Sequence, residues 1–229
     1  EYPMGTDNVG RDNFTRFLYG GQLSLRIGLT GITLGALIGI ALGLISGYFG
    51  GWLDSFISWF TDVLMAFPDI LLALAIIAIL GPGINNAMLA IGIAFVPSFM
   101  RLTRSSVLAL REMTYIEAAK ALGSSDARIL VRHILPNSIR TLLVLITLGI
   151  GSSILAGAAL NFLGLGAEPP TAEWGAMLNA GMKFVRQAWW LTVFPGLGIF
   201  LAVLSINLIG DAVSDAVAGT SIVAMQDKK

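Results

Sequence analysis

The chain has 229 residues, of which 55% are hydrophobic and 12% are charged, and its formal net charge is zero. Soluble domains carry about 25% charged residues, so this composition indicates a membrane protein rather than a soluble domain. The neutral balance gives no support for nucleic-acid binding. Because the chain has no cysteine and one histidine, it cannot form a disulfide, a thiolate metal site or a multi-histidine metal site.

Five stretches are long enough to span a membrane, since a spanning helix needs about 20 mostly apolar residues. We predict an all-α integral membrane protein with spans at 23–47, 53–80, 84–110, 139–163 and 190–209. Residues 1–22 are a polar segment before the first span, 23–216 form the transmembrane domain, and 217–229 are a polar C-terminal tail. The first residue is Glu1 rather than Met, so we expect a fragment or a processed chain.

The segment 111–138 is long and basic and sets the expected orientation. Cytoplasmic loops of membrane proteins carry an excess of Lys and Arg. In and beside this segment the basic residues are Arg111, Lys120, Arg128, Arg132 and Arg140. We therefore expect this loop and the C-terminus in the cytoplasm and residues 1–22 outside it.

A stripe of glycines follows the first predicted span. Its members, each four residues after the last, are Gly31, Gly35, Gly39, Gly43 and Gly47. Small residues at this spacing let another helix approach closely with a right-handed crossing. We interpret the stripe as a helix-packing face; a direct role in a transport path is the alternative.

Three carboxylates lie on the second predicted span, and Asp62 is the deepest of them. Asp54 is near the end of the span, and Asp69 follows Pro68, which we expect to break the helix so that Asp69 caps the resumed one. Intramembrane carboxylates normally face a cavity or a partner. For Asp62 we predict pairing with another helix, with a role in the pathway or an ion pair as the alternative.

The basic loop is predicted to fold as helix, glycine turn, helix. An apolar face is expected from Tyr115, Ile116, Ala119 and Leu122, with Glu117 and Lys120 on other sides. Gly123 would end the first helix in a left-handed conformation. Ser124 or Ser125 would cap a second short helix with Asp126 in its first turn, and Pro136 marks the next boundary. Such an element suits docking into a groove of a partner, although a structured loop without a partner would carry the same pattern.

The loop resembles the EAA loop of permease subunits in ABC importers. The pattern consists of Glu117-Ala118-Ala119, Gly123 and Pro136, with His133 where the general pattern has isoleucine. Further segments resemble the C-type subunit of the dipeptide, oligopeptide and nickel permease family: Gly5-Thr6-Asp7, Gly10-Arg11-Asp12, Asn161 to Gly166, Pro169-Pro170-Thr171, Glu173-Trp174-Gly175, Phe194-Pro195-Gly196 and Asn207 to Asp211. The resemblance covers about residues 3–216. It departs where the family usually has a sixth, N-terminal helix and an acidic, proline-containing end.

The resemblance implies the type I importer permease fold, with a cytoplasmic coupling helix seated on an ATPase. It implies coupling residues Tyr115, Glu117, Ala118, Ala119, Leu122, Gly123, Ser124 and Asp126. The implied partners are a second homologous permease subunit, two cytoplasmic ATPase subunits that bind ATP and Mg, and an extracytoplasmic substrate-binding protein, all at a bacterial plasma membrane. The chain itself would need no cofactor.

Transport rather than catalysis is the expected activity. The sequence contains no Walker A pattern and no set of nucleophile, base and acid. Peptides are the expected solutes, with nickel complexes or other small solutes as the alternative. A transporter or channel that works without ATPases, an intramembrane enzyme and a passive scaffold subunit are the competing interpretations.

Overall fold

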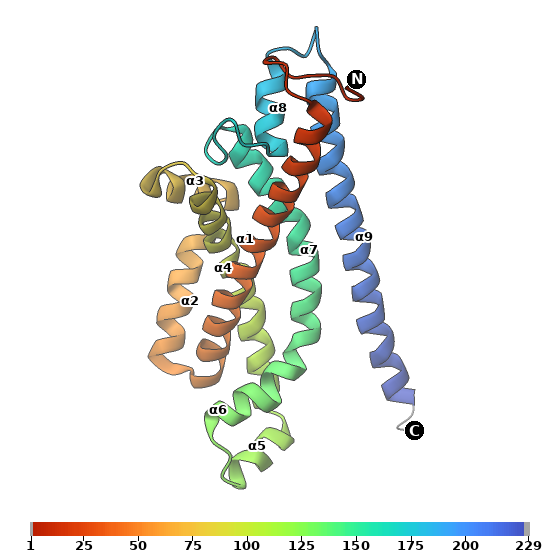
Figure 1. The fold of residues 1–229 in the computed structure, drawn as a ribbon. Coiled ribbons are helices and arrows are strands. Elements are labelled where there is room, and N and C mark those ends of the chain that lie inside the picture. The colour runs from red at the N-terminus through yellow and green to blue at the C-terminus, as the bar shows by residue number, and fades with distance from the viewer. Residues whose placement is uncertain (1, 227–229) are drawn as a thin grey trace.

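The long helices of the chain lie side by side in one elongated bundle (Figure 1). The computed structural model describes residues 2–226, and of Arg140 and residues 217–226 only the backbone, so all side chains of the predicted polar tail lie outside the described part of the chain. The helices are α1 (Asn13–Phe49), α2 (Gly51–Met65), α3 (Asp69–Leu80), α4 (Ile84–Arg111), α5 (Thr114–Ala121), α6 (Asp126–Ile129), the π-helical turn η1 (Leu130–Ile134), α7 (Leu135–Phe162), α8 (Trp174–Met182) and α9 (Trp190–Gln226). The described residues form no strand, and the predicted all-α fold is confirmed.

Four helices, α1, α4, α7 and α9, are each long and apolar enough to cross a membrane. The predicted second span is different, because α2 and α3 meet at a bend of 96°. The break expected at Pro68 is therefore confirmed. The pair counts as a fifth crossing only if the bent helices are taken as one broken span.

The first helix begins at Asn13. The apolar span that hydropathy predicted begins ten residues later, at Leu23. The side chain of Asp12 caps it by accepting hydrogen bonds from the amides of Phe14 and Thr15. A side-chain oxygen at this position satisfies amides that have no partner within the helix. The helix therefore includes residues 13–22 of the polar segment that was predicted to precede the first span.

The glycine stripe of α1 lies against α4. A methyl carbon built at Gly39 would stand 2.5 Å from Phe99 Cβ and 2.6 Å from the carbonyl oxygen of Val96, and the other four glycines meet α4 in the same way. Gly31 meets Ile91 at one end of the stripe and Gly47 meets Val107 at the other. Residue numbers rise together on both helices, so α1 and α4 run parallel.

The next helices continue the bundle with alternating direction. Gly28 of α1 lies against Ile154 of α7, whereas Ile32, one turn later, lies against Gly149, so these helices are antiparallel. Residue 207 of α9 lies against Gly151, and Gly210 against Leu148, so α9 is antiparallel to α7. Residues 111–138 consequently lie at one end of the bundle, here named the loop end, and residues 2–12 with α8 lie at the opposite N-terminal end (Figure 1).

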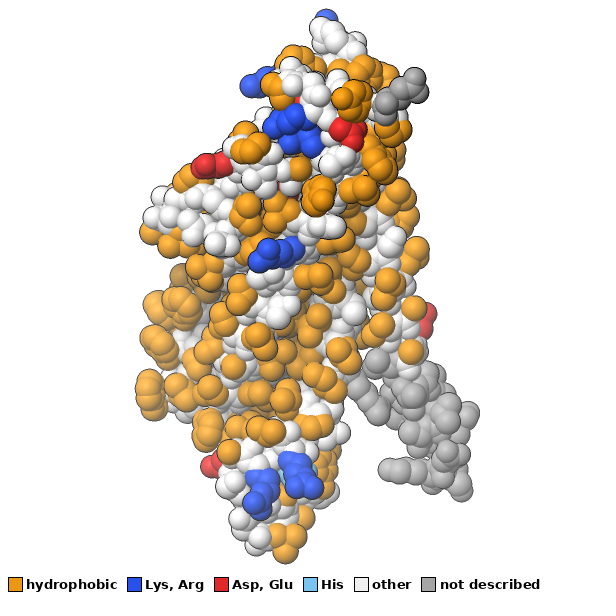
Figure 2. Space-filling view, viewed as in Figure 1, with side chains coloured by type: hydrophobic (Ala, Val, Ile, Leu, Met, Phe, Trp, Pro, Cys, Tyr) orange, Lys and Arg blue, Asp and Glu red, His pale blue; other side chains and the backbone are white. Residues whose placement is uncertain are grey.

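The surface agrees with a membrane environment. Hydrophobic side chains cover the middle of the face in Figure 2, and most charged side chains lie towards the two ends. Helix α2 adds large exposed aromatic groups, among them Trp52, which is 80% exposed, and Trp59. A soluble protein would bury such groups, because an extended exposed apolar surface marks contact with lipid or with another protein.

Candidate functional site

The loop end carries a compact helix–turn–helix that follows α4. Helix α5 ends at Ala121, and Gly123 has φ +79°. The amide of Gly123 donates to the carbonyl of Lys120, and the amide of Ser124 donates to the carbonyl of Ala119. These two bonds form the Schellman motif, in which a left-handed residue ends a helix. The helix stop predicted at Gly123 is confirmed.

Four apolar side chains that are completely buried anchor this element to the bundle. Ile116 of α5, Ile129 of α6 and Ile134 of η1 pack together with Val107 of α4, and Leu44 of α1 lies against them. Burial of such side chains contributes about 1.5–3 kcal/mol each. The element is therefore held as a rigid extension of α1 and α4.

The outer surface of the element is exposed and partly apolar. The residues of the predicted apolar face lie in different environments, because Ile116 is completely buried while Tyr115 is 42% and Leu122 87% exposed. Burial is decided by α1 and α4 and not by the pattern of α5 itself. Of the predicted coupling residues, Ala119 and Ser124 are half-buried, and the exposed ones are Tyr115, Glu117, Ala118, Leu122, Gly123 and Asp126.

A contact that the sequence did not predict joins the element to the end of α1. The hydroxyl of Tyr48 donates to Asp126 Oδ1 over 2.6 Å. The ammonium nitrogen of Lys120 lies 5.1 Å from the centre of the Tyr48 ring, within cation–π distance. Tyr48 thus touches both helices on either side of the Gly123 turn. The sequence offered one sign of this contact, namely a polar aromatic residue, Tyr48, directly after the last glycine of the stripe.

The second helix of the element runs without interruption into α7. Ser125 is at its N-cap position but makes no side-chain capping bond, so only the position of the predicted cap is confirmed. Pro136 has no N–H, and in a regular α-helix its ring would clash with the carbonyl of Arg132. The π-turn before it, closed by the amide of Leu135 on the carbonyl of Leu130, accommodates this. Pro136 therefore starts α7 and does not separate two helices.

The carboxylates of α2 face arginines of α4. Asp62 lies 2.7 Å from a guanidinium nitrogen of Arg101, and both side chains are more than half exposed. Asp54 receives a two-pronged contact from Arg104, at 2.6 and 2.7 Å, and its oxygen also accepts from the hydroxyl of Ser46. Asp62 is the carboxylate that the sequence predicted to be paired, but Asp54 has more partners.

Asp69 does not cap α3 through its side chain. The N-cap position is occupied by Pro68, and no side-chain capping bond is present. Asp69 lies in the first helical turn, where a negative charge is favoured by the helix dipole. It also lines a cavity of about 290 Å³ that is otherwise mostly apolar and lies between α3, α4 and α7.

At the N-terminal end, a buried carboxylate joins α8 to α1. Glu173 accepts a hydrogen bond of 2.6 Å from the hydroxyl of Ser24 and one of 2.8 Å from the amide of Ala176. Burial raises the pKa of this carboxyl, against the opposing effect of these bonds. Beside it, Trp174 donates to the carbonyl of Phe17 and stacks on the Phe17 ring. The Glu173-Trp174-Gly175 segment therefore fixes the N-terminal end of the bundle.

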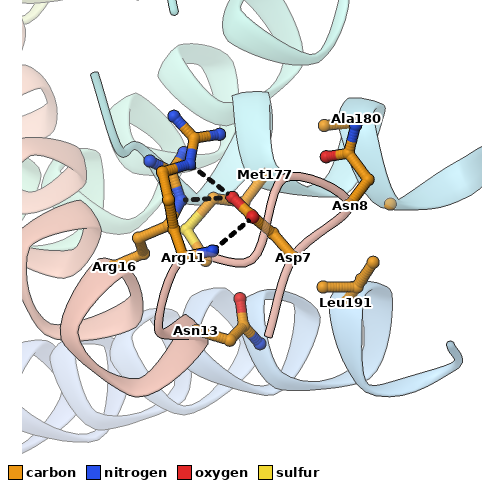
Figure 3. A pocket seen from close by; sticks show the side chains of 9 residues that line it. Asp7, Asn8, Arg11, Asn13, Arg16, Met177, Ala180 and Leu191 are labelled. Carbon is orange, nitrogen blue, oxygen red and sulfur yellow. Dashed lines mark hydrogen bonds and ion pairs between the residues drawn. The ribbon is translucent and has the colours of Figure 1, made fainter. Parts of the chain in front are cut away.

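A small cavity at the same end is closed by an ion-pair cluster (Figure 3). Asp7 pairs with Arg11 at 2.6 Å and lies 3.6 Å from Arg16. Burial alone would raise the pKa of Asp7, but hydrogen bonds from Arg11 and Val9 outweigh it and lower the pKa. The cavity of about 30 Å³ has room for one or two waters. Its charges are already paired, so the cluster orders the first residues and offers little to a ligand.

No group of three or more His, Cys, Asp or Glu side chains is placed to hold a metal ion within the described residues.

Comparison with known proteins identifies the fold and the family. The family described as binding-protein-dependent transport system inner membrane component matches residues 39–219. The dipeptide transport system permease protein DppC of Alkalihalophilus pseudofirmus is 52% identical over 216 residues, which are 94% of this chain and 71% of that protein. The glutathione transport system permease protein GsiD of Pectobacterium atrosepticum is 47% identical over 93% of this chain and 71% of its own length.

Two solved structures share the fold. The MetNI methionine ABC transporter in an inward-facing conformation superposes with a TM-score of 0.69 and 19% identity, over 89% of this chain and 97% of that chain. An amino acid ABC transporter crystallised with histidines gives a TM-score of 0.66 and 16% identity, over 89% and 94%. The predicted type I importer permease fold is confirmed, and the chain belongs to the family of inner membrane components of binding-protein-dependent transport systems.

Proposed function

We propose that this chain is the permease subunit of an ATP-driven importer, that it forms half of the pathway for peptides or similar small solutes, and that residues 111–138 couple it to an ATPase. Its family consists of transporter subunits, and its relatives include permeases named for dipeptide and glutathione transport. Nickel complexes and other small solutes remain the alternative cargo.

The observation that carries this proposal is the geometry of the helix–turn–helix at the loop end. Its inner side is fixed to α1 and α4 by Ile116, Ile129 and Ile134, which are completely buried. Its outer side presents Leu122 at 87% exposure, together with Tyr115 and Val131. A short helix that is rigidly attached and apolar on its outer side is suited to insertion into a groove of another protein.

The same geometry explains how movement would reach the membrane part. Tyr48 and Leu44 tie the element to α1, and Val107 ties it to α4. Helices α1 and α4 are packed through the glycine stripe, with carbonyl oxygens near glycine carbons along its length. A displacement of the element should therefore move α1 and α4 together, as one unit.

The partners and the orientation follow from this proposal. Residues 111–138 and the end of α9 would lie in the cytoplasm, where two ATPase subunits bind ATP and Mg. Residues 2–12 and α8 would face an extracytoplasmic substrate-binding protein. A second permease subunit would cover part of the exposed apolar surface and complete the pathway. ATP binding and hydrolysis would alternate the pathway between two accessible states by shifting their populations.

The test uses Gly123→Val in the complete importer reconstituted in liposomes. A β-branched residue at φ +79° is strained by about 1–2 kcal/mol or more, so the turn should change shape. We expect solute uptake per ATP hydrolysed to fall strongly. Gly10→Val is the matched control, because Gly10 has φ +81°, also has open space around it, and lies at the opposite end. Unchanged coupling in Gly123→Val, or equal uncoupling in both variants, would refute the proposed docking.

A further inference from the structure

A cavity of about 520 Å³ opens between the first part of α1 and the start of α4. Its polar lining groups are Arg26 of α1 and the amides of Asn85 and Asn86 of α4, and the Gly83 backbone closes one side. Ligand sites typically have volumes of about 300–1,000 Å³, an apolar wall and a few polar groups that converge. No acidic residue lines this cavity, so its side chains carry one positive charge.

Arg26 differs from the other arginines of α1 and α4. Arg16 contacts Asp7 and the carbonyl of Pro170, Arg101 and Arg104 pair with carboxylates of α2, and Arg111 donates to the carbonyl of Gly47. The side chain of Arg26, which is exposed, has neither a hydrogen bond nor an ion pair with any residue that the structure describes. An exposed arginine near a membrane surface needs no protein partner, because its side chain can reach the interface, so the Arg26 guanidinium is available to a ligand.

The position of Arg26 along α1 places the cavity at a membrane surface. At the loop end, Arg111 contacts Gly47 and Lys120 contacts Tyr48. These charged side chains mark one surface of the membrane. From Gly47 to Arg26 the helix rises about 31 Å, and the hydrocarbon layer is about 30 Å thick. Arg26 therefore lies at the opposite membrane surface, which is the extracytoplasmic one under the proposed function.

The amide of Asn85 completes an anion-binding arrangement, whereas the amide of Asn86 is already engaged. Asn86 donates to the carbonyls of Leu80 and Gly81 and so holds the turn before α4 in place. Asn85 is exposed and has no hydrogen bond among the described residues, so its amide is available to a ligand. A guanidinium and a nearby amide donor match the two oxygens of a carboxylate.

We propose that Arg26, assisted by Asn85, binds the carboxylate of the solute at the outer mouth of the pathway. This inference rests on the proposed import of peptides or similar solutes, and it adds the residues that would bind the free carboxylate of such a solute. The site would accept the solute as it leaves the binding protein and before it enters the apolar part of the bundle.

The first test measures uptake of a labelled dipeptide by the complete importer in liposomes. We expect Arg26→Gln to raise the concentration for half-maximal uptake about tenfold, which corresponds to the loss of one charge-assisted hydrogen bond. Arg26→Lys should have a smaller effect, since the charge remains. Arg186→Gln is the matched control, because Arg186 is exposed at the same end and lies outside the cavity.

The second test asks whether a carboxylate contacts Arg26 in the native complex. Phenylglyoxal modifies accessible arginines, and the modified positions are read by mass spectrometry. We expect an excess of dipeptide to protect Arg26 and to leave Arg186 unprotected, while the C-terminal amide of the same dipeptide protects neither. Equal protection by the acid and the amide, or an Arg26 that the reagent does not reach, would overturn the inference.

The outcomes separate this inference from the proposed function. If Arg26→Gln imports the dipeptide as the wild type does, the carboxylate site is refuted and the importer stands. If Arg26→Gln lowers uptake but the dipeptide gives no protection, Arg26 pairs with a protein carboxylate in the complex, and the inference is again refuted. If the wild type imports no peptide at all, peptide import and the inference that rests on it both fail.

Discussion

The close packing of α1 on α4 predicts that Gly39→Ala destabilises the assembled importer. The added methyl carbon would stand 2.5 Å from Phe99 Cβ and 2.6 Å from the carbonyl oxygen of Val96, whereas carbon atoms in contact lie about 3.5–4.0 Å apart. The two helices must separate by about 1 Å. Overpacking of this kind costs about 1–3 kcal/mol, and the better helix propensity of alanine offsets about 0.5–1 kcal/mol.

At the middle of these ranges the net loss is about 1 kcal/mol, which should lower the thermal midpoint of the purified complex in detergent by about 2–4 °C. Gly196→Ala in α9 is the matched control, because the nearest heavy atom to its added carbon is 3.9 Å away. We expect the midpoint of that variant to equal or exceed that of the wild type. If Gly39→Ala melts with the wild type, or if Gly196→Ala melts equally early, the packing argument is wrong.

Three more predictions concern charged and polar contacts. Glu117→Lys should weaken retention of the ATPase in a pull-down, because its exposed carboxylate is placed at the proposed interface; full retention would place Glu117 outside it. Asp62→Asn removes one charge of the pair with Arg101 and should lower uptake or assembly, whereas full uptake would show that the pair is dispensable. Tyr48→Phe deletes the bond to Asp126 and should lower uptake per ATP while complex yield stays the same; unchanged coupling would show that this contact does not transmit movement.

Local signals predicted the apolar spans, the break at Pro68 and the turn at Gly123 well. Each depends on properties of neighbouring residues: hydropathy over about 20 positions, the missing N–H of proline, or the left-handed conformation that glycine adopts. The start of α1 was placed too late because hydropathy does not register the Asp12 cap or the partners of Arg16.

Contacts between distant segments could not be predicted in the same way. Which residue of the apolar face of α5 is buried depends on Val107 and on α1, so the sequence could not separate the buried Ile116 from the exposed Leu122. Asp54 and Arg104 can both be identified in the sequence as charged residues of predicted spans. Their pairing could not be predicted, because it depends on how α2 and α4 align. The sequence also could not show that the Arg26 side chain lacks a partner. That follows only from the structure, in which the other arginines of α1 and α4 have partners.

Cross-linking from Leu122 tests the central claim most directly. The chain has no cysteine, so Leu122→Cys introduces a single thiol at a site that is 87% exposed in the wild type. A photoactivatable linker on this thiol should join the chain to an ATPase subunit in the assembled importer, while the same linker on Asn8→Cys, at the opposite end, should not. An adduct of the Leu122 variant with the substrate-binding protein, or with no protein at all, would contradict the assignment of this element to ATPase coupling.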